Sequence, residues 1–137
     1  MGLIRIDYRD RKLIYEQLID NIKQLILVGE LKKGDFLPSV RSLSKELGIN
    51  PNTTQKAYTE LERQEIIASM PGRGSVIVRE AREMADMGCA SLRPEMMQIA
   101  ARAGAFGMNE QEFLTLAADC YRRNYKESKG KEIGTDD

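Results

Sequence analysis

The chain has 137 residues, with 21 lysines and arginines against 21 aspartates and glutamates, two cysteines, and no histidine or tryptophan. This length fits one or two small domains and is too short for a large α/β enzyme fold. Without histidine, these residues cannot form Ser-His-Asp, Cys-His or imidazole-metal sites. The zero net charge argues against a uniformly basic nucleic-acid binder, but it does not say how the charges are distributed.

The two cysteines, Cys89 and Cys120, lie 31 residues apart and lack the CxxC spacing of a zinc site. We expect both to be reduced and mostly buried, as small apolar side chains. The N-terminus is charged where a signal peptide would be apolar, and no stretch has membrane-spanning length. The sequence therefore predicts a cytoplasmic protein with no metal, no cofactor and no membrane partner.

An amphipathic helix is predicted over residues 14–28, followed by Gly29 as a left-handed cap. A second, short helix is predicted to begin after Pro38, with Ser39 as its N-cap, and to end at Gly48. The buried faces of these two helices are predicted to contain Ile14, Leu18, Ile22, Leu25 and Ile26, and Val40, Leu43 and Leu47.

Asn50 and Pro51 predict the start of a third helix, because Asn caps free backbone donors and Pro suits a first turn. This helix should extend to about residue 64 and bury Ala57, Tyr58 and Leu61. Two short helices joined by a tight glycine-containing turn form a helix-turn-helix, whose second helix can enter a DNA groove.

Two β-prone runs follow, residues 66–70 and 75–78, separated by a Pro-Gly-Arg-Gly turn with Arg73 projecting from its end. Helix, helix-turn-helix and hairpin is the order of a winged helix-turn-helix. The predicted fold class is therefore mainly α with a small β-hairpin, and the predicted DNA-binding domain covers residues 1–78.

Residues 79–127 are predicted to form a short helical dimerisation region, and residues 128–137 a flexible tail without apolar periodicity. The apolar stripes assigned to dimerisation contain Met84, Met87, Met96, Ile99, Phe113, Leu116 and Cys120. The first stripe is expected to be interrupted around residues 88–91, and Pro94 either kinks this helix or begins a new one. Asn109 and Glu112 resemble a capping box. The alternative is that the stripes pack on the chain's own winged helix.

The run from Leu37 to Val78 closely resembles the winged helix-turn-helix of GntR-family transcriptional regulators, with LPSVR, NPNTTQKAY and GRGS in the family's order. Together with the first helix, YEQLIDNIKQLILVGEL, the resemblance covers about the first 78 residues. The short C-terminal part resembles the YtrA-type subfamily, whose members carry a compact dimerisation region in place of a metabolite-binding domain.

The residues predicted to contact DNA are Arg41, Asn50, Asn52, Thr53, Gln55, Lys56, Gly72 and Arg73. In GntR proteins the arginine that matches Arg41 contacts DNA. In the recognition helix, Asn and Gln side chains suit adenine edges, and a Thr methyl suits thymine. At the hairpin tip, Gly72 and Arg73 form a wing that can approach the minor groove or a phosphate. The alternatives are ordinary capping residues and solvated surface charges. Pro51 stands where several relatives place a DNA-contacting basic residue, so their base specificity does not transfer.

These observations favour a sequence-specific transcriptional regulator that binds double-stranded DNA. A repressor is favoured over an activator. We expect the protein to bind a palindromic operator as a homodimer. The YtrA-type resemblance implies a setting near transporter genes. The alternative is a winged-helix module that binds other proteins. An enzyme is least favoured, because no paired acid/base carboxylates, phosphate loop or metal-ligand cluster is present. An effector molecule stays undetermined.

The neutral total divides into a mildly basic first part and a mildly acidic second part. Residues 1–78 carry 12 basic and 10 acidic side chains, whereas residues 79–137 carry 9 and 11. Positive charge available to DNA is therefore limited to a few placed residues, and we expect weak non-specific affinity.

Overall fold

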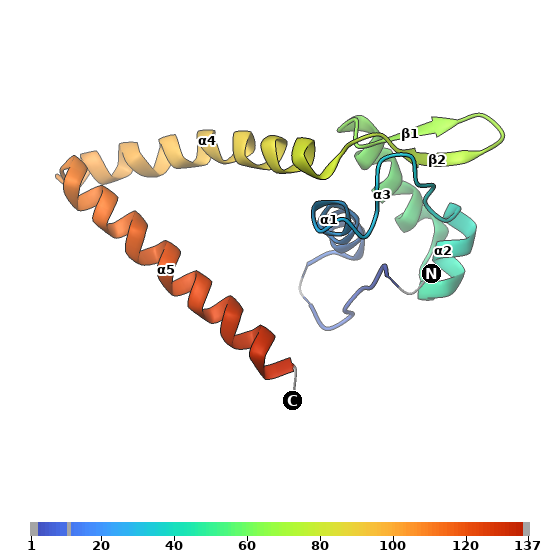
Figure 1. The fold of residues 1–137 in the computed structure, drawn as a ribbon, viewed down its shortest axis with the longest axis horizontal. Coiled ribbons are helices and arrows are strands. Elements are labelled where there is room, and N and C mark those ends of the chain that lie inside the picture. Colours follow the sequence, from blue (N-terminus) through green and yellow to red (C-terminus); the bar gives the residue numbers. More distant parts are fainter. Residues whose placement is uncertain (1–2, 11, 136–137) are drawn as a thin grey trace. The chain divides into compact units, whose positions relative to one another are not determined.

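The computed structural model describes residues 3–10 and 12–135, with side chains described up to residue 125. It confirms a mainly helical fold with one β-hairpin. In chain order the elements are α1 (Ile14–Leu27), α2 (Val40–Leu47), α3 (Pro51–Arg63), β1 (Ile67–Met70), β2 (Gly74–Ile77), α4 (Ala81–Ala105) and α5 (Glu110–Thr135) (Figure 1). Residues 1–89 form one unit and residues 90–137 a second.

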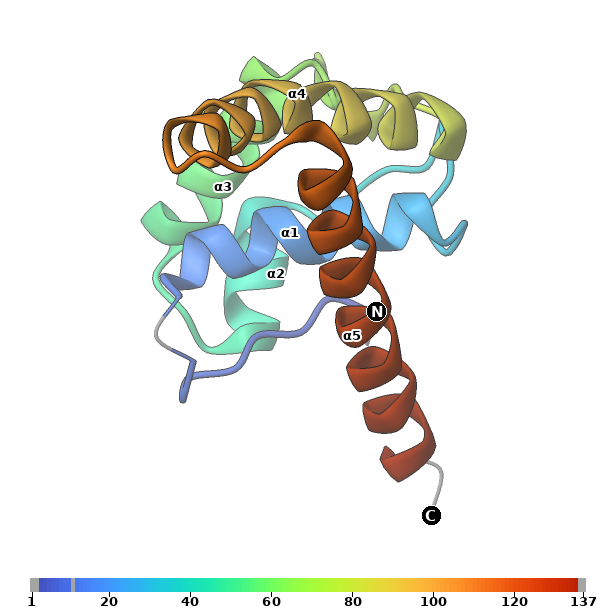
Figure 2. The same cartoon turned by 90° about the vertical axis from the view of Figure 1, so that its left-hand side faces the viewer.

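The first unit is built around α1, which packs on α3 next to α2 (Figure 2). One face of α1 is buried and supplies Leu18, Ile22 and Ile26 to the core, as its spacing predicts. Ala57, Tyr58 and Leu61 of α3 are buried in the same core, also as predicted. Burying a side chain as large as Leu or Ile stabilises a fold by about 1.5–3 kcal/mol, so this layer supplies most of the unit's stability.

Local capping signals place the helix ends where the sequence predicts them. The Ser39 hydroxyl accepts a hydrogen bond from the Ser42 amide at 3.0 Å, and the Asn50 side chain accepts one from the Asn52 amide at 2.8 Å. Gly48 ends α2 with φ at 69°, and the next amide, that of Ile49, donates to the Ser44 carbonyl at 3.0 Å. The turn of the helix-turn-helix is therefore fixed by local hydrogen bonds.

A buried polar pair that the sequence analysis missed joins the two helices of the helix-turn-helix. The Ser44 hydroxyl of α2 donates to the Thr54 hydroxyl of α3 at 2.7 Å, and the two residues are only 3% and 0% exposed. In addition, the Tyr58 hydroxyl donates to the Pro38 carbonyl at 2.7 Å. Such directional contacts fix the angle between helices more tightly than apolar packing alone.

The predicted wing is present, with β1 and β2 antiparallel and Ile67 opposite Ile77. Phe36, in the connection between α1 and α2, forms a bridge to Val76, and the Leu37 amide donates to the Ser75 carbonyl at 2.9 Å. This connection therefore pairs with the outer edge of β2, which the sequence analysis did not predict. The edge strand of the wing is thereby covered and held against the helices.

The N-terminal segment before α1 is also part of the first unit. Ile4 is 2% exposed and lies in the core, and the Asp7 amide donates to the Gln17 side chain of α1 at 2.7 Å. The Tyr8 hydroxyl donates to the Leu47 carbonyl at the end of α2. Residues 3–10 thus link α1 to the helix-turn-helix, a role that periodicity does not reveal.

The long helices α4 and α5 differ from expectation in several places. Pro94 does not begin a new helix, because α4 continues through it; the interruption predicted around residues 88–91 concerns the apolar stripe and does not break the helix. The predicted burial of Cys89 and Cys120 is also wrong, because both lie on exposed faces of the long helices. Helix α5 extends to Thr135, although the sequence predicts a tail without regular structure from residue 128. The units also divide within α4, at residues 89 and 90, and not at residue 78.

Other features of these helices agree with the sequence. The capping box is confirmed: the Glu112 amide donates to the Asn109 side chain at 2.8 Å, and the Asn109 amide donates to the Glu112 carboxylate at 3.1 Å. Among the described residues, neither long helix has an apolar stretch sufficient to cross a bilayer.

We predict that Thr54→Val lowers the free energy of unfolding by about 1–3 kcal/mol, because it leaves the buried Ser44 hydroxyl without its acceptor. Urea denaturation of the full chain measures this. The double variant Ser44→Ala with Thr54→Val should lose less than the sum of the two single variants, because both polar groups are then absent. A Thr54→Val protein as stable as the unmodified chain would contradict the role of the pair.

Candidate nucleic-acid interface

The polar residues predicted to read DNA lie on the first two turns of α3. Asn52, Gln55 and Lys56 are exposed and Thr53 is half-buried, whereas Thr54 between them faces the core. Helical geometry explains the division, because residues three and four apart share a face. The side-chain oxygen of Asn50 is occupied as the N-cap acceptor, so its amide nitrogen is the group that can donate to DNA.

Lys56 is held by an aromatic ring on a different helix. Its ammonium lies 3.9 Å from the centroid of the Tyr15 ring in the first turn of α1. A cation over an aromatic face is stabilised by roughly 0.5–1 kcal/mol at an exposed site. Tyr15 was not among the predicted site residues, and no sequence signal marks it, because the contact joins residues far apart in the chain.

Lys56 and Asn52 lie at one side of a groove of about 880 Å³ between α1 and α3, which is also lined by Gln55. Acidic residues line the same groove: Glu60 of α3 and Glu16 and Asp20 of α1. Hydrogen bonds from Arg63 and Gln64 lower the pKa of Glu60 to about 2, so this carboxylate is ionised at neutral pH. Lys12 and Lys23 line the same groove, and Glu60 and Asp20 are paired with Arg63 and Lys12, so the acidic charge is locally balanced.

The wing tip supplies the second predicted contact. Gly72 has φ at 74° and open space where a side chain would stand, so the backbone at the tip is accessible. Arg73 is exposed, and its guanidinium carbon lies 5.1 Å from the centroid of the Phe36 ring. Arg73 is thus supported by a ring in the connection between α1 and α2, which bridges to β2. Two of the predicted cations, Lys56 and Arg73, rest on aromatic rings.

The third predicted contact, Arg41, is exposed on the first turn of α2. All eight predicted DNA-contact residues therefore belong to the first unit and lie at three places, the starts of α2 and α3 and the wing tip. Their contacts with DNA stay predictions. The dimerisation residues divide differently: Met84 is 5% exposed and belongs to the core of the first unit, so it does not belong to an exposed apolar face.

Residues 14–77 match the family described as bacterial regulatory proteins, gntR family. A solved structure of YtrA from Sulfolobus acidocaldarius, a GntR-family transcription factor, is 36% identical to this chain, with a TM-score of 0.59. The match covers 76% of this chain and 99% of that one. The chain belongs to the GntR family.

Two further similarities support this assignment. The HTH-type transcriptional repressor YtrA of Bacillus subtilis is 50% identical over 80 residues, which cover 58% of this chain and 62% of the relative. The chain thus matches less than two thirds of that repressor's length. A transcriptional regulator from Oenococcus oeni is 30% identical, with a TM-score of 0.65, and the match covers 85% of this chain and 97% of that structure.

The GntR assignment confirms the winged helix-turn-helix and the class of function that the sequence predicts. The relatives are named as transcriptional regulators and repressors, and the matched family is described as bacterial regulatory proteins. The chain therefore carries the winged helix-turn-helix of this family of regulators.

We predict that Arg41→Ala and Arg73→Ala each weaken DNA binding severalfold and reduce the slope of log affinity against log salt by about 1 if the residue contacts a phosphate. Gel shifts over a salt series measure both quantities. Arg63→Ala is the matched control, because Arg63 lies at the far end of α3 and pairs with Glu60. An unchanged slope would show that the arginine is not a phosphate contact.

We also predict that Tyr15→Leu weakens DNA binding by about two- to fivefold, because Lys56 loses the ring that orders it. Tyr15→Phe keeps the ring and should bind like the unmodified protein. In a Lys56→Ala background Tyr15→Leu should have no further effect. Weaker binding by Tyr15→Phe would instead point to a direct contact of the hydroxyl with DNA.

Proposed function

We propose that the protein is a repressor that binds a palindromic operator as a homodimer. The observation that carries this proposal is the apolar surface of the second unit. One winged helix offers a few contacts at three places, too few for high specificity. Two copies related by a two-fold axis double these contacts on an inverted repeat.

Within the second unit, α5 diverges from α4 after the connection at residues 106–109, so the helices cover little of each other (Figure 1). Large apolar side chains stay exposed on both helices. The exposed fractions of Phe106 and Met97 are 86% and 65%. The remaining exposed apolar side chains described in this unit are Leu92, Met96, Ile99, Leu114, Leu116, Tyr121 and Tyr125.

Such a density of exposed apolar side chains is unusual for a monomer and typical of an association surface. A second copy of the chain is the occupant that suits this surface, because a two-fold dimer also satisfies the need for a second winged helix. Of the predicted dimerisation residues, Met87, Met96, Ile99, Leu116 and Cys120 are exposed and Phe113 is half-buried in the single chain. Met84 is left out of the proposed interface.

The recognition helices of such a dimer would lie about 34–36 Å apart, one turn of DNA. The name of the 50% identical relative, a transcriptional repressor, supports repression as the mode of action. The YtrA-type resemblance supports transporter genes as targets. A chromosomal operator also implies a cytoplasmic location.

Selection of binding sites from random double-stranded DNA by the full chain tests this function. We expect an inverted repeat whose half-sites lie about one helical turn apart. Enrichment of an isolated half-site would contradict the dimer. No enrichment at all would contradict the operator and favour a protein-interaction role for the winged helix.

We predict that Leu116→Asp raises the dissociation constant of the dimer by at least about tenfold, because it places a charge in an apolar interface. Sedimentation equilibrium measures this, and affinity for the palindrome should fall in parallel while affinity for a half-site stays the same. Val28→Asp is the matched control, because Val28 is 59% exposed in the first unit. A Leu116→Asp protein that still dimerises normally would contradict the assigned surface.

A further inference from the structure

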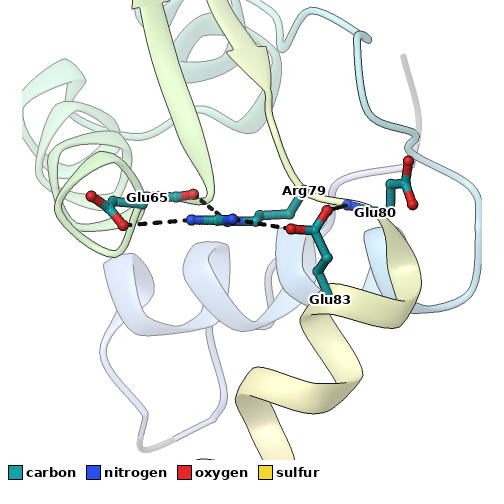
Figure 3. A network of polar contacts seen from close by, with 4 residues as sticks. All are labelled: Glu65, Arg79, Glu80 and Glu83. Carbon is teal, nitrogen blue, oxygen red and sulfur yellow. Dashed lines mark hydrogen bonds and ion pairs between the residues drawn. The ribbon is translucent and has the colours of Figure 1, made fainter.

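Arg79 connects three elements of the first unit at the point where the winged helix ends. It lies in the connection between β2 and α4, residues 78–80. Its guanidinium lies between Glu65 and Glu83, as Figure 3 shows. Nε donates to the Glu65 carbonyl at 2.8 Å, Nη1 donates to the Glu83 carboxylate at 3.0 Å, and Nη2 lies 3.5 Å from the Glu65 carboxylate.

Glu65 brings the end of the recognition helix into this network. It follows the C-cap of α3 and adopts φ at 60°, the sole positive φ among the described non-glycine residues. This conformation lets the next amide, that of Ile66, donate back to the Leu61 carbonyl at 3.0 Å. It also turns the Glu65 carbonyl toward Arg79, so the guanidinium is bonded to the backbone that ends α3 (Figure 3).

Glu83 brings the first turn of α4 into the same network. One carboxylate oxygen accepts from Arg79, and the other accepts from the Glu80 amide at 3.1 Å, which caps the helix (Figure 3). These two hydrogen bonds hold the pKa of Glu83 below its usual range. The next residue, Met84, is buried in the core of the first unit. The start of α4 is thus bonded on one side and packed on the other.

We propose that Arg79 is a positioning residue that fixes the direction in which α4 leaves the winged helix and so sets the half-site spacing that the dimer accepts. The proposal rests on the proposed homodimer. Helix α4 begins at Ala81 in the first unit and ends at Ala105 in the second, so it is the segment that joins the winged helix to the proposed interface.

The forked geometry of arginine suits this role. Planar donors that reach a backbone carbonyl and two carboxylates restrict the angle between the three groups, whereas a single ammonium does not. The Arg79 side chain is 28% exposed, against 81% for Glu65, so it is the inner member of the cluster. Ion pairs this close to solvent contribute little to stability, so the expected effect is on geometry.

The test uses the full chain and duplexes carrying the selected operator, with the distance between half-sites changed by about one to three base pairs. The unmodified protein should lose at least about tenfold in affinity when the spacing changes. The affinity of Arg79→Met should fall by less than about threefold on the same duplexes. Its affinity for a single half-site should stay within about twofold of that of the unmodified protein. The control is Arg82→Met, which removes an exposed arginine from the first turn of α4 and should keep the original spacing profile.

Two milder variants keep the test valid if Arg79→Met fails to fold. Arg79→Lys keeps the charge but not the fork, and Glu83→Gln keeps an acceptor for the Glu80 amide but not the ion pair. Both should show an intermediate tolerance of spacing. If these variants are dimeric and their spacing profile is unchanged, the proposed role of Arg79 is overturned, while the homodimer proposal stands. If the unmodified protein shows no preference for the palindrome, the homodimer proposal fails, and the role of Arg79 fails with it.

Discussion

The packing of α1 on α3 is the constraint on which the rest of the first unit depends. Because Thr54, Ala57 and Leu61 of α3 are buried, the rotation of the helix about its axis is fixed. Residues 52, 55 and 56 must then lie on the outer face, where DNA can reach them. The core therefore determines which side chains are presented to DNA, although its own residues are buried and cannot reach a base.

Polar contacts add what apolar packing does not specify. The Ser44–Thr54 hydrogen bond fixes α2 on α3, and Tyr8 connects the N-terminal segment to the end of α2. The bridge from Phe36 to Val76 holds the wing against the same unit. Each contact is directional, so the starts of α2 and α3 and the wing tip are held as one rigid arrangement.

Sequence patterns predicted the features that depend on neighbouring residues. Capping by Ser39 and Asn50, the left-handed Gly48 and the hairpin all arise within a few residues of chain, and all are present. The features that were missed join distant residues, as in the contact of Tyr15 with Lys56. Whether Pro94 kinks α4 or begins a new helix was likewise not decided by its neighbours in the chain, and the structure places Pro94 inside the helix.

The backbone of Glu65 has a consequence for engineering this protein. A non-glycine residue in the left-handed region costs about 1–2 kcal/mol, so glycine would relax the turn after α3 and raise thermal stability. The same change would delete the carboxylate beside Arg79 and weaken the hydrogen-bond network that links the end of α3 to the start of α4. A thermostabilised version obtained in this way would melt later yet discriminate operators less sharply, which is the familiar conflict between rigidity of the fold and fidelity of its function.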